Sequence, residues 1–481
     1  MKLSEYVKFD ALGLASLVAK KEVTAGELEK AAGGAIALVN PRINAVIEQW
    51  SGEGPSADSG AQGGVFHGVP FLIKDVAISM QGKKVELGSR LGAGNVAGAD
   101  SNLMRHFRNA GLVTIGRTTS PEMAFSTTSE SAFNGPTRNP WNLERSAGGS
   151  SGGAAAAVAA GIVPIAHATD AAGSIRVPAS STGLFGIKTT RGRVSNGPFM
   201  DEVFNGFGVQ LGVSRTVRDS AALLDAIHGP DAGEPYYTAK GEASFLSEVT
   251  RDPGQLRIGV MLDAWDGQRP AAPVRDATLD AAKLCTQLGH HVDDASLNIG
   301  VSWDEFVHAN AQIWCANLVG WIEGLAAATG RTPDLSVLEA STLACYEYGK
   351  RASAAAYAGA LDVRNRVTRA VAPFFEKYDV LLTPTLPDVP LPIGVYSNGA
   401  EAMDGLAWTA RVFKHSPYTP VFNVAGVPAM SVPLGSDNTG LPIGIQFVAG
   451  FARDHILFRL AGQLERSAPW IDRIPAVWAG K

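Results

Sequence analysis

Short runs of apolar residues alternate along the chain with longer segments in which apolar positions recur every three or four residues. Runs of about four to eight residues are typical of buried strands, and the longer periodic segments are typical of helices. Strands alternating with helices over the whole length predict one large α/β/α unit. The expected strands cover residues 43–49, 68–75, 112–117, 163–168, 256–262, 379–383, 429–433 and 443–448, and the expected helices cover 11–20, 101–110, 152–160, 272–288, 302–329, 361–378 and 454–466.

The pattern gives one domain boundary and no obvious linker. Asp10 can cap the first helix, and Thr24 with Glu27 forms a capping box for a second one. We therefore expect an N-terminal helical segment over residues 1–60 that packs on a catalytic domain over residues 61–481. The stretch 230–370 is richer in helix and aromatic residues than the rest, so we expect any helical cap to lie within it.

Composition excludes several classes of protein. The chain has 481 residues, of which 46% are hydrophobic and 18% are charged, so it is not disordered. Its 54 glycines show no three-residue period, which excludes collagen. The net charge is −5 and no basic run is present, so we expect no nucleic-acid partner.

Cysteine and histidine usage bears on location and cofactors. The three cysteines have no CxxC spacing, which suits a reducing cytoplasm, and we expect a cytoplasmic protein. The nine histidines form no metal-binding pattern, so we expect no metal and no other cofactor. The N-terminus does not resemble a secretory signal, and the longest apolar region, 154–168, is too short to span a membrane.

One segment carries two serines between two glycine pairs, directly before an alanine-rich helix. It runs over residues 146–153 with the sequence SAGGSSGG. A phosphate-binding loop would end in Gly-Lys-Ser/Thr, and a dinucleotide fingerprint would place GxGxxG directly after a strand; neither pattern is present. Taken alone, the segment is equally consistent with a simple turn that starts a helix.

A second segment, residues 168–178, favours nucleophilic catalysis. Ser174 follows small residues where a strand passes into a helix, and small residues leave backbone N–H groups uncovered, as an oxyanion hole requires. Asp170 and Arg176 straddle this turn and can pair to brace it. A nucleophilic serine needs a base, and the candidates are His167 and Lys74. Lys74 ends the apolar strand 69–73, where burial can remove its proton near neutral pH.

The strand-end lysine and the two serine segments together resemble the amidase signature family of serine hydrolases. The resemblance continues through residues 183–194, 379–385 and 440–446, and so covers most of the chain. It implies a central, mostly parallel, mixed and twisted sheet that is covered by helices on both faces. It further implies hydrolysis of amide carbon–nitrogen bonds through an acyl-enzyme, with no cofactor.

The same resemblance implies specific roles in a Ser–cis-Ser–Lys triad. Ser174 is the expected nucleophile, Ser150 the bridging serine and Lys74 the base. Ser150 is expected to follow a cis peptide after Gly149, and Ser151 to support the site by a hydrogen bond. The backbone N–H groups expected to hold the oxyanion are those of Ala171, Ala172, Gly173 and Ser174. Ala172 departs from the usual glycine, and its methyl group requires a negative φ.

The substrate is the least defined part of the prediction. The aromatic segment 312–321 is either core packing or a pocket wall that brings Cys315 to the substrate. This segment and the Ala172 variant are similar to the branch of 6-aminohexanoate cyclic dimer hydrolases, which implies small linear or cyclic aliphatic amides. Carbamates (urethanes) and aryl acylamides are the alternatives.

Two other functions are alternatives to amide hydrolysis. A glutamine amidotransferase A subunit would carry an aspartate that is missing from residues 415–420. A binding protein on an amidase scaffold does not need the intact set of Lys74, Ser150 and Ser174. We expect a small-molecule amide as the partner, no membrane association, and a homodimer as the default oligomer.

Overall fold

The structure, a computed structural model, describes residues 1–53, 63–239, 241 and 243–481. The boundary expected between residues 60 and 61 lies outside the described residues. In spatial order, the strands of the main sheet are β1 (Val46–Glu53), β3 (Val113–Thr118), β2 (Pro70–Lys74), β8 (Ile165–Asp170), β10 (Val209–Ser214), β9 (Phe185–Lys188), β14 (Ala429–Ser436), β15 (Pro442–Ala449), β13 (Val380–Pro384), β11 (Arg257–Val260) and β12 (His291–Asp294). Two small hairpins pair β4 (Glu130–Ser131) with β5 (Gly135–Pro136), and β6 (Arg138–Asn139) with β7 (Asn142–Ser146).

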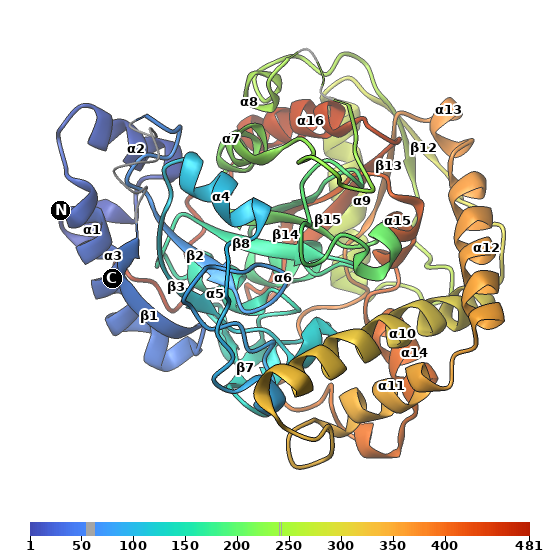
Figure 1. The fold of residues 1–481 in the computed structure, drawn as a ribbon. Coiled ribbons are helices and arrows are strands. Elements are labelled where there is room, and N and C mark those ends of the chain that lie inside the picture. Colours follow the sequence, from blue (N-terminus) through green and yellow to red (C-terminus); the bar gives the residue numbers. More distant parts are fainter. Residues whose placement is uncertain (54–62, 240, 242) are drawn as a thin grey trace.

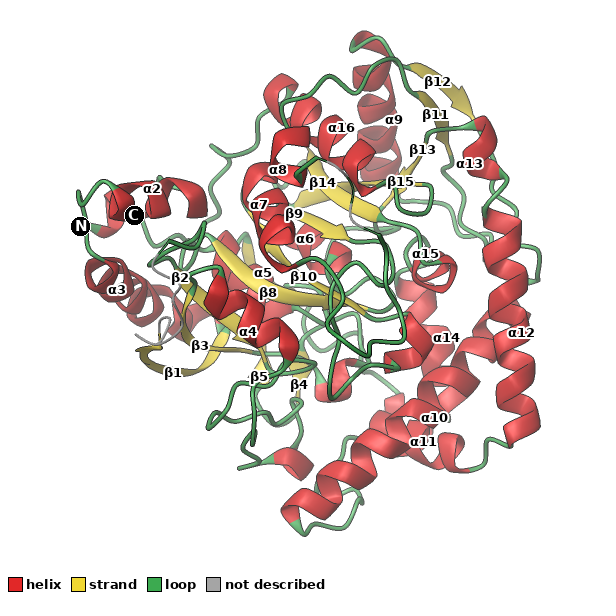
Figure 2. Ribbon diagram, turned by 45° about the horizontal axis from the view of Figure 1, so that its top comes forward, coloured by secondary structure: helices red, strands yellow, loops and turns green. Residues whose placement is uncertain are grey.

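Helices flank this sheet, as expected, and others gather beside it (Figures 1 and 2). The α-helices are α1 (Leu3–Tyr6), α2 (Ala11–Ala19), α3 (Ala25–Ile43), α4 (Asn102–Asn109), α5 (Gly152–Ala159), α6 (Arg176–Thr182), α7 (Val217–Ile227), α8 (Phe245–Glu248), α9 (Ala272–Gln287), α10 (Trp303–Thr329), α11 (Ala340–Lys350), α12 (Ala354–Val371), α13 (Phe374–Lys377), α14 (Gly405–His415), α15 (Pro420–Ala425) and α16 (Asp454–Ser467). The short 3₁₀ helices are η2 (Arg90–Gly92), η3 (Glu122–Ala124), η4 (Val203–Gly206) and η5 (Ala400–Ala402). Asp10 and Thr24 cap α2 and α3 as expected.

The sheet is mixed, but it is less parallel than we expected. Among the described strands, six of the ten pairings in the main sheet are antiparallel. The difference arises largely from β9 and β10, which the apolar pattern did not single out. These two strands join β8 to β14 through antiparallel pairings only. The helix expected over 361–378 is also interrupted: α12 ends at Val371 and α13 starts after Pro373, because proline cannot continue a helix.

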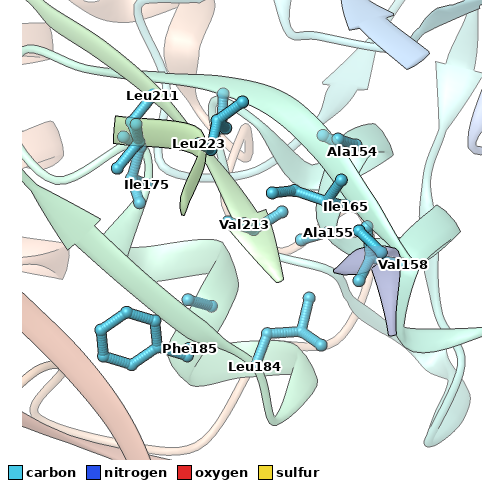
Figure 3. Packing of buried hydrophobic residues seen from close by; sticks show 14 of the residues in the cluster. Ala154, Ala155, Val158, Ile165, Ile175, Leu184, Phe185, Leu211, Val213 and Leu223 are labelled. Atoms are coloured by element: carbon cyan, nitrogen blue, oxygen red, sulfur yellow. The ribbon is translucent and has the colours of Figure 1, made fainter. Parts of the chain in front are cut away.

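Side chains alternate between two hydrophobic clusters on either side of the sheet. On β13, Val380 and Leu382 belong to one cluster and Leu381 belongs to the other, as the two-residue period of a strand requires. The first cluster joins the sheet to α5, α7 and α16, and Figure 3 shows Ala154, Ile165, Phe185, Val213 and their neighbours gathered in it. The second cluster joins the sheet to the helices α10, α11, α12 and α14, which lie together in Figure 1.

Candidate active site

Lys74 lies at the end of β2 and is buried, with 1% of its surface exposed. Its Nζ atom contacts three hydroxyl oxygens: Ser150 Oγ at 2.7 Å, Thr169 Oγ1 at 2.8 Å and Ser151 Oγ at 3.0 Å. The structure therefore brings the expected lysine together with Ser150 and Ser151. Burial lowers the pKa of Lys74 well below that of an exposed lysine, and the carboxylate of Asp170 partly opposes this shift.

All three hydroxyl oxygens accept a hydrogen bond from the Lys74 amino group. Ser151 Oγ accepts a hydrogen bond from the Thr169 N–H at 3.2 Å and donates one to the Thr169 carbonyl at 3.3 Å. The hydroxyl of Ser151 is thus directed away from Lys74, so Ser151 faces the amine as an acceptor. Thr169 Oγ1 and Ser150 Oγ are the other two acceptors of the Lys74 amine.

The two serines are held by a tight turn that ends at the N-terminus of α5. The peptide bond between Gly149 and Ser150 is cis, as the resemblance led us to expect. Gly149 lies against another backbone segment: a Cβ at this position would lie 2.7 Å from the carbonyl carbon of Thr128. The site therefore requires glycine at this position.

Ser174 lies in the turn between β8 and α6 and is half-buried. Its side chain and that of Ser150 line the same cavity. In the part of the chain that the structure describes, the Ser174 hydroxyl has no hydrogen-bond partner, so it is open to a molecule in this cavity. Ala172 does not adopt a positive φ, so its methyl group is compatible with the backbone of this turn.

The four backbone N–H groups expected to form the oxyanion hole are not equivalent. The N–H of Gly173 donates to Asp170 Oδ1 at 2.7 Å. Within the described chain, the N–H groups of Ala171, Ala172 and Ser174 have no acceptor. Gly173 has a φ of +133°, and a Cβ at this position would lie 2.5 Å from Thr419 Oγ1. Backbone conformation and packing therefore both require glycine at position 173. The geometry leaves three candidate donors rather than four.

Asp170 and Arg176 form a fully buried ion pair, which is the brace that we expected across this turn. The Arg176 Nη2 and Nε atoms each lie 2.9 Å from a carboxylate oxygen of Asp170. Arg176 also donates to Gln446 Oε1, Asn423 Oδ1 and the Thr419 carbonyl, so the pair joins the turn to β15 and α15. Burial alone would raise the pKa of Asp170, but Arg176 holds it at about 2.

His167, the other candidate base, has both ring nitrogens engaged. Nδ1 lies 3.3 Å from the backbone nitrogen of Lys74, and Nε2 lies 3.0 Å from Gln210 Oε1. Burial lowers the pKa of His167 to about 3. The ring is therefore neutral near pH 7 and oriented by neighbours on both sides, with no free nitrogen for a serine.

Cys315 is the expected site residue that the structure does not bring to the cavity. It is fully buried among α10, α11 and α14, where Gly405 packs against its sulfur. The neighbouring Trp314 lines the cavity instead, together with Trp321 and Phe204. Consecutive residues of a helix point about 100° apart, so the aromatic side chains and Cys315 face different neighbours. The segment 312–321 is thus a pocket wall through its tryptophans.

Thr169 was not among the residues that we expected at the site. It lies one residue before Asp170 at the end of β8, and alternation along a strand places these two side chains on opposite faces. Asp170 faces Arg176, so Thr169 faces the strand's other side, where Lys74 lies. The parallel pairing of β2 and β8 was the missing information, since it brings these strand ends together.

Two further features concern metals and membranes. Among the described residues, no three His, Cys, Asp or Glu side chains are grouped so that they could hold a metal ion. No helix in the described ranges is both long and apolar enough to cross a membrane.

The chain is similar to known amide hydrolases over nearly its whole length. The Amidase family model matches residues 28–458. The 6-aminohexanoate-cyclic-dimer hydrolase of Paenarthrobacter ureafaciens is 35% identical over 97% of this chain and 96% of that protein. The acylamidase of Rhodococcus erythropolis is 31% identical, with 97% of each chain covered.

Solved structures agree with this relationship. The structure of a 6-aminohexanoate cyclic dimer hydrolase superposes with a TM-score of 0.91 at 34% identity, covering 98% of this chain and 99% of that one. A bacterial aryl acylamidase of the amidase signature family superposes with a TM-score of 0.83 at 27% identity, covering 97% and 98%. This chain therefore belongs to the amidase signature family and is an enzyme that hydrolyses the carbon–nitrogen bond of amides.

Proposed function

We propose that the enzyme uses Ser174 as nucleophile, Ser150 as proton carrier and Lys74 as base. The observation that supports this most is the buried amine of Lys74, 2.7 Å from Ser150 Oγ, beside a cavity into which the Ser174 hydroxyl is open. Because burial lowers the pKa of Lys74 well below that of an exposed lysine, its amine can accept a proton under working conditions.

The chemistry proceeds in two balanced stages. Ser174 Oγ bonds to the amide carbon as its proton moves to Ser150 Oγ and the Ser150 proton moves to Lys74. The carbonyl electron pair moves onto oxygen, where the N–H groups of Ala171, Ala172 and Ser174 stabilise it. The C–N bond then breaks, and the leaving nitrogen takes its proton from Ser150, which is reprotonated by Lys74. Water repeats these steps on the acyl-enzyme and releases the acid.

We further propose small aliphatic amides of the 6-aminohexanoate type, linear or cyclic, as substrates. The similarity to cyclic dimer hydrolases supports this class, and so does the cavity wall. Among the described lining residues of the catalytic cavity, Asp170 alone is charged, and it is neutralised by Arg176. Aryl acylamides and carbamates also present a carbonyl next to nitrogen and are the competing classes.

The test is a hydrolysis screen of 6-aminohexanoate cyclic dimer, linear oligomers, anilides, carbamates and glutamine. The Ser174→Ala variant should lose all amide hydrolysis while it keeps the wild-type circular dichroism spectrum and melting temperature. A fluorophosphonate probe should label Ser174 of the wild type, as read by peptide mass spectrometry. Amide hydrolysis by Ser174→Ala at the wild-type rate would exclude Ser174 as the nucleophile.

A further inference from the structure

The catalytic cavity is too narrow to hold a whole substrate in this structure. Its volume is about 30 Å³, far below the range of about 300–1,000 Å³ that is typical of small-molecule sites. Val203, Phe204 and Trp314 form its apolar wall. The cavity thus has room for the reacting carbonyl group, and the rest of a substrate must lie elsewhere.

A second cavity of about 470 Å³ adjoins it. We call this second cavity the outer chamber. Ala77, Asn196 and Trp321 line both cavities, so the two cavities meet at these residues. Its size falls within the range of about 300–1,000 Å³ that is typical of small-molecule sites.

The lining of the outer chamber is uncharged. Among its described lining residues there is no Asp, Glu, Lys, Arg or His, and Ile78, Phe199 and Leu325 make much of it apolar. The Asn196 side chain is already engaged, since its Nδ2 donates to the Gly208 carbonyl and its Oδ1 accepts from Gln210. A charged group that entered this chamber would lose hydration without gaining a partner of opposite charge.

Two glycines in the interior of α10 lie in the wall of the outer chamber. Gly320 and Gly324 are one helical turn apart, and both line this cavity. No atom lies within 4 Å of the position that a Cβ would take at either residue, so packing within the protein does not require glycine there. Glycine is unfavourable inside a helix compared with alanine. A side chain at these positions would occupy space beside the chamber.

We propose that the outer chamber binds the uncharged, apolar part of the substrate that extends from the scissile amide. The catalytic cavity then holds only the reacting group. This inference rests on the proposed amide hydrolysis at Ser174. It assigns Gly320, Gly324 and Trp321 as residues that determine specificity for chain length and charge.

The experiment compares two series of neutral amides. The first series varies the acyl group of p-nitroanilides from acetyl to butyryl, hexanoyl and octanoyl. The second varies the amine side of N-alkyl acetamides over the same lengths.

Each fully buried methylene contributes up to about fourfold in affinity. We therefore expect kcat/KM to rise at least tenfold along one series. That series identifies the side of the substrate that enters the chamber. If the acyl series is the one that rises, the 6-aminohexanoyl anilide, with its terminal ammonium group, should be hydrolysed at least tenfold less efficiently than the hexanoyl anilide.

Gly324→Val tests the position of the chain directly. It should lower the octanoyl-to-acetyl ratio of kcat/KM, or the corresponding ratio of the amine series, at least fivefold. The matched control is Gly359→Val on α12, another helical glycine with an open Cβ position that lines no described cavity. This control should leave the ratio unchanged. Melting temperatures of both variants separate misfolding from a filled chamber.

Binding to Ser174→Ala separates this inference from the proposed function. Calorimetric titration with the octanoyl anilide and the N-octyl acetamide measures binding without hydrolysis, and Gly324→Val in this background should weaken binding at least fivefold. If the wild type hydrolyses none of these amides but Ser174→Ala binds them, and Gly324→Val weakens that binding, the result would count against the proposed function alone. Flat length dependence in both series, or a ratio that Gly324→Val does not change, would overturn the outer chamber as the substrate site.

Discussion

The backbone N–H of Gly173 donates a 2.7 Å hydrogen bond to Asp170 Oδ1, three residues earlier in the chain. The carboxylate therefore holds the turn from inside and takes one N–H group out of the candidate oxyanion hole. Its other oxygen accepts from the N–H of Ile175 at 3.2 Å. Asp170 is thus a positioning residue, because its carboxylate fixes the backbone on both sides of Ser174.

Replacing Asp170 should impair catalysis more than its effect on folding explains. Asp170→Asn keeps the shape of the side chain but leaves Arg176 buried without its counter-charge. Breaking a buried pair in this way costs about 3–5 kcal/mol of unfolding free energy. Loss of the turn geometry should also lower kcat about 10²–10³-fold, the effect of losing one oxyanion donor. Urea denaturation and steady-state kinetics on the folded fraction measure the two effects.

Asp454→Asn is the matched control for that variant. Asp454 is also fully buried and pairs with Arg193, and it accepts a hydrogen bond from the N–H of Thr190. It lines neither of the two cavities. The control should lose comparable stability yet keep its kcat per folded molecule. Equal losses of kcat in both variants would show that Asp170 acts only through general stability.

Asp170→Asn should also shift the pH dependence of kcat/KM. The proposed mechanism needs neutral Lys74, so kcat/KM falls as pH drops below the pKa of this amine. The negative charge of Asp170 raises that pKa, and its removal should lower it. The acid limb of the kcat/KM profile of Asp170→Asn should therefore move to lower pH than in the wild type. An acid limb that stays in place or moves to higher pH would contradict lysine as the base.

Thr169 should orient the Lys74 amine. Thr169→Val removes the acceptor 2.8 Å from Nζ and preserves the shape of the side chain. Loss of one such hydrogen bond should cost about 1 kcal/mol of stability and lower kcat about tenfold, because the amine of Lys74 is no longer held towards Ser150. Thr278→Val on α9 is the control, since Thr278 is also buried and hydrogen-bonded. The control should keep kcat; an equal loss there would remove the special role of Thr169.

The resemblance to the amidase signature family, which short segments carry, implied which residues meet. Lys74, Ser150 and Ser151 converge as expected, and the Asp170–Arg176 pair forms within its own turn. What could not be predicted depends on how distant strands pair. The place of Thr169 beside Lys74 follows from β2 lying parallel to β8. The direction of each N–H group in the turn 171–174 depends on backbone angles that residue types do not specify.

Helix orientation and short strands account for the other differences. The sequence left the aromatic segment of α10 open between core packing and a pocket wall. Its rotation about the helix axis decides that Trp314 and Trp321 line the cavity and that Cys315 does not. The strands β9 and β10 contain glycines and a polar residue that interrupt their apolar pattern, and their antiparallel pairing changes the character of the sheet. The two-domain division, the homodimer and the cytoplasmic location stay predictions.

A buried carboxyl group beneath the cavity should make stability depend on pH. Glu122 begins η3, whose last residue, Ala124, lines the catalytic cavity. The hydroxyl of Ser89 lies 2.6 Å from Glu122 Oε1, and the N–H of Glu339 donates to Oε2 at 2.8 Å. Burial, together with the nearby carboxylate of Glu339, raises the pKa of Glu122 to about 7. The group is therefore protonated in the folded protein over a pH range in which it is ionised in the unfolded chain.

The sign of the effect follows from this raised pKa. Protonated Glu122 stabilises the folded protein. This contribution is fully present below the pKa of Glu122 in the unfolded chain, near 4.5, and is lost as pH rises through its pKa in the folded protein, about 7. The pKa difference corresponds to about 3 kcal/mol. Glu122→Gln stays neutral at every pH, and its carbonyl oxygen can accept one of the two hydrogen bonds that the Ser89 hydroxyl and the Glu339 N–H donate to Glu122. The wild type should thus lose unfolding free energy relative to Glu122→Gln between pH 5 and 8, as measured by urea denaturation.

The control is Glu347→Gln, because Glu347 forms an exposed ion pair with Lys350. This variant should keep the wild-type pH dependence of stability. Parallel stability profiles for wild type and Glu122→Gln would show that Glu122 does not titrate in this range.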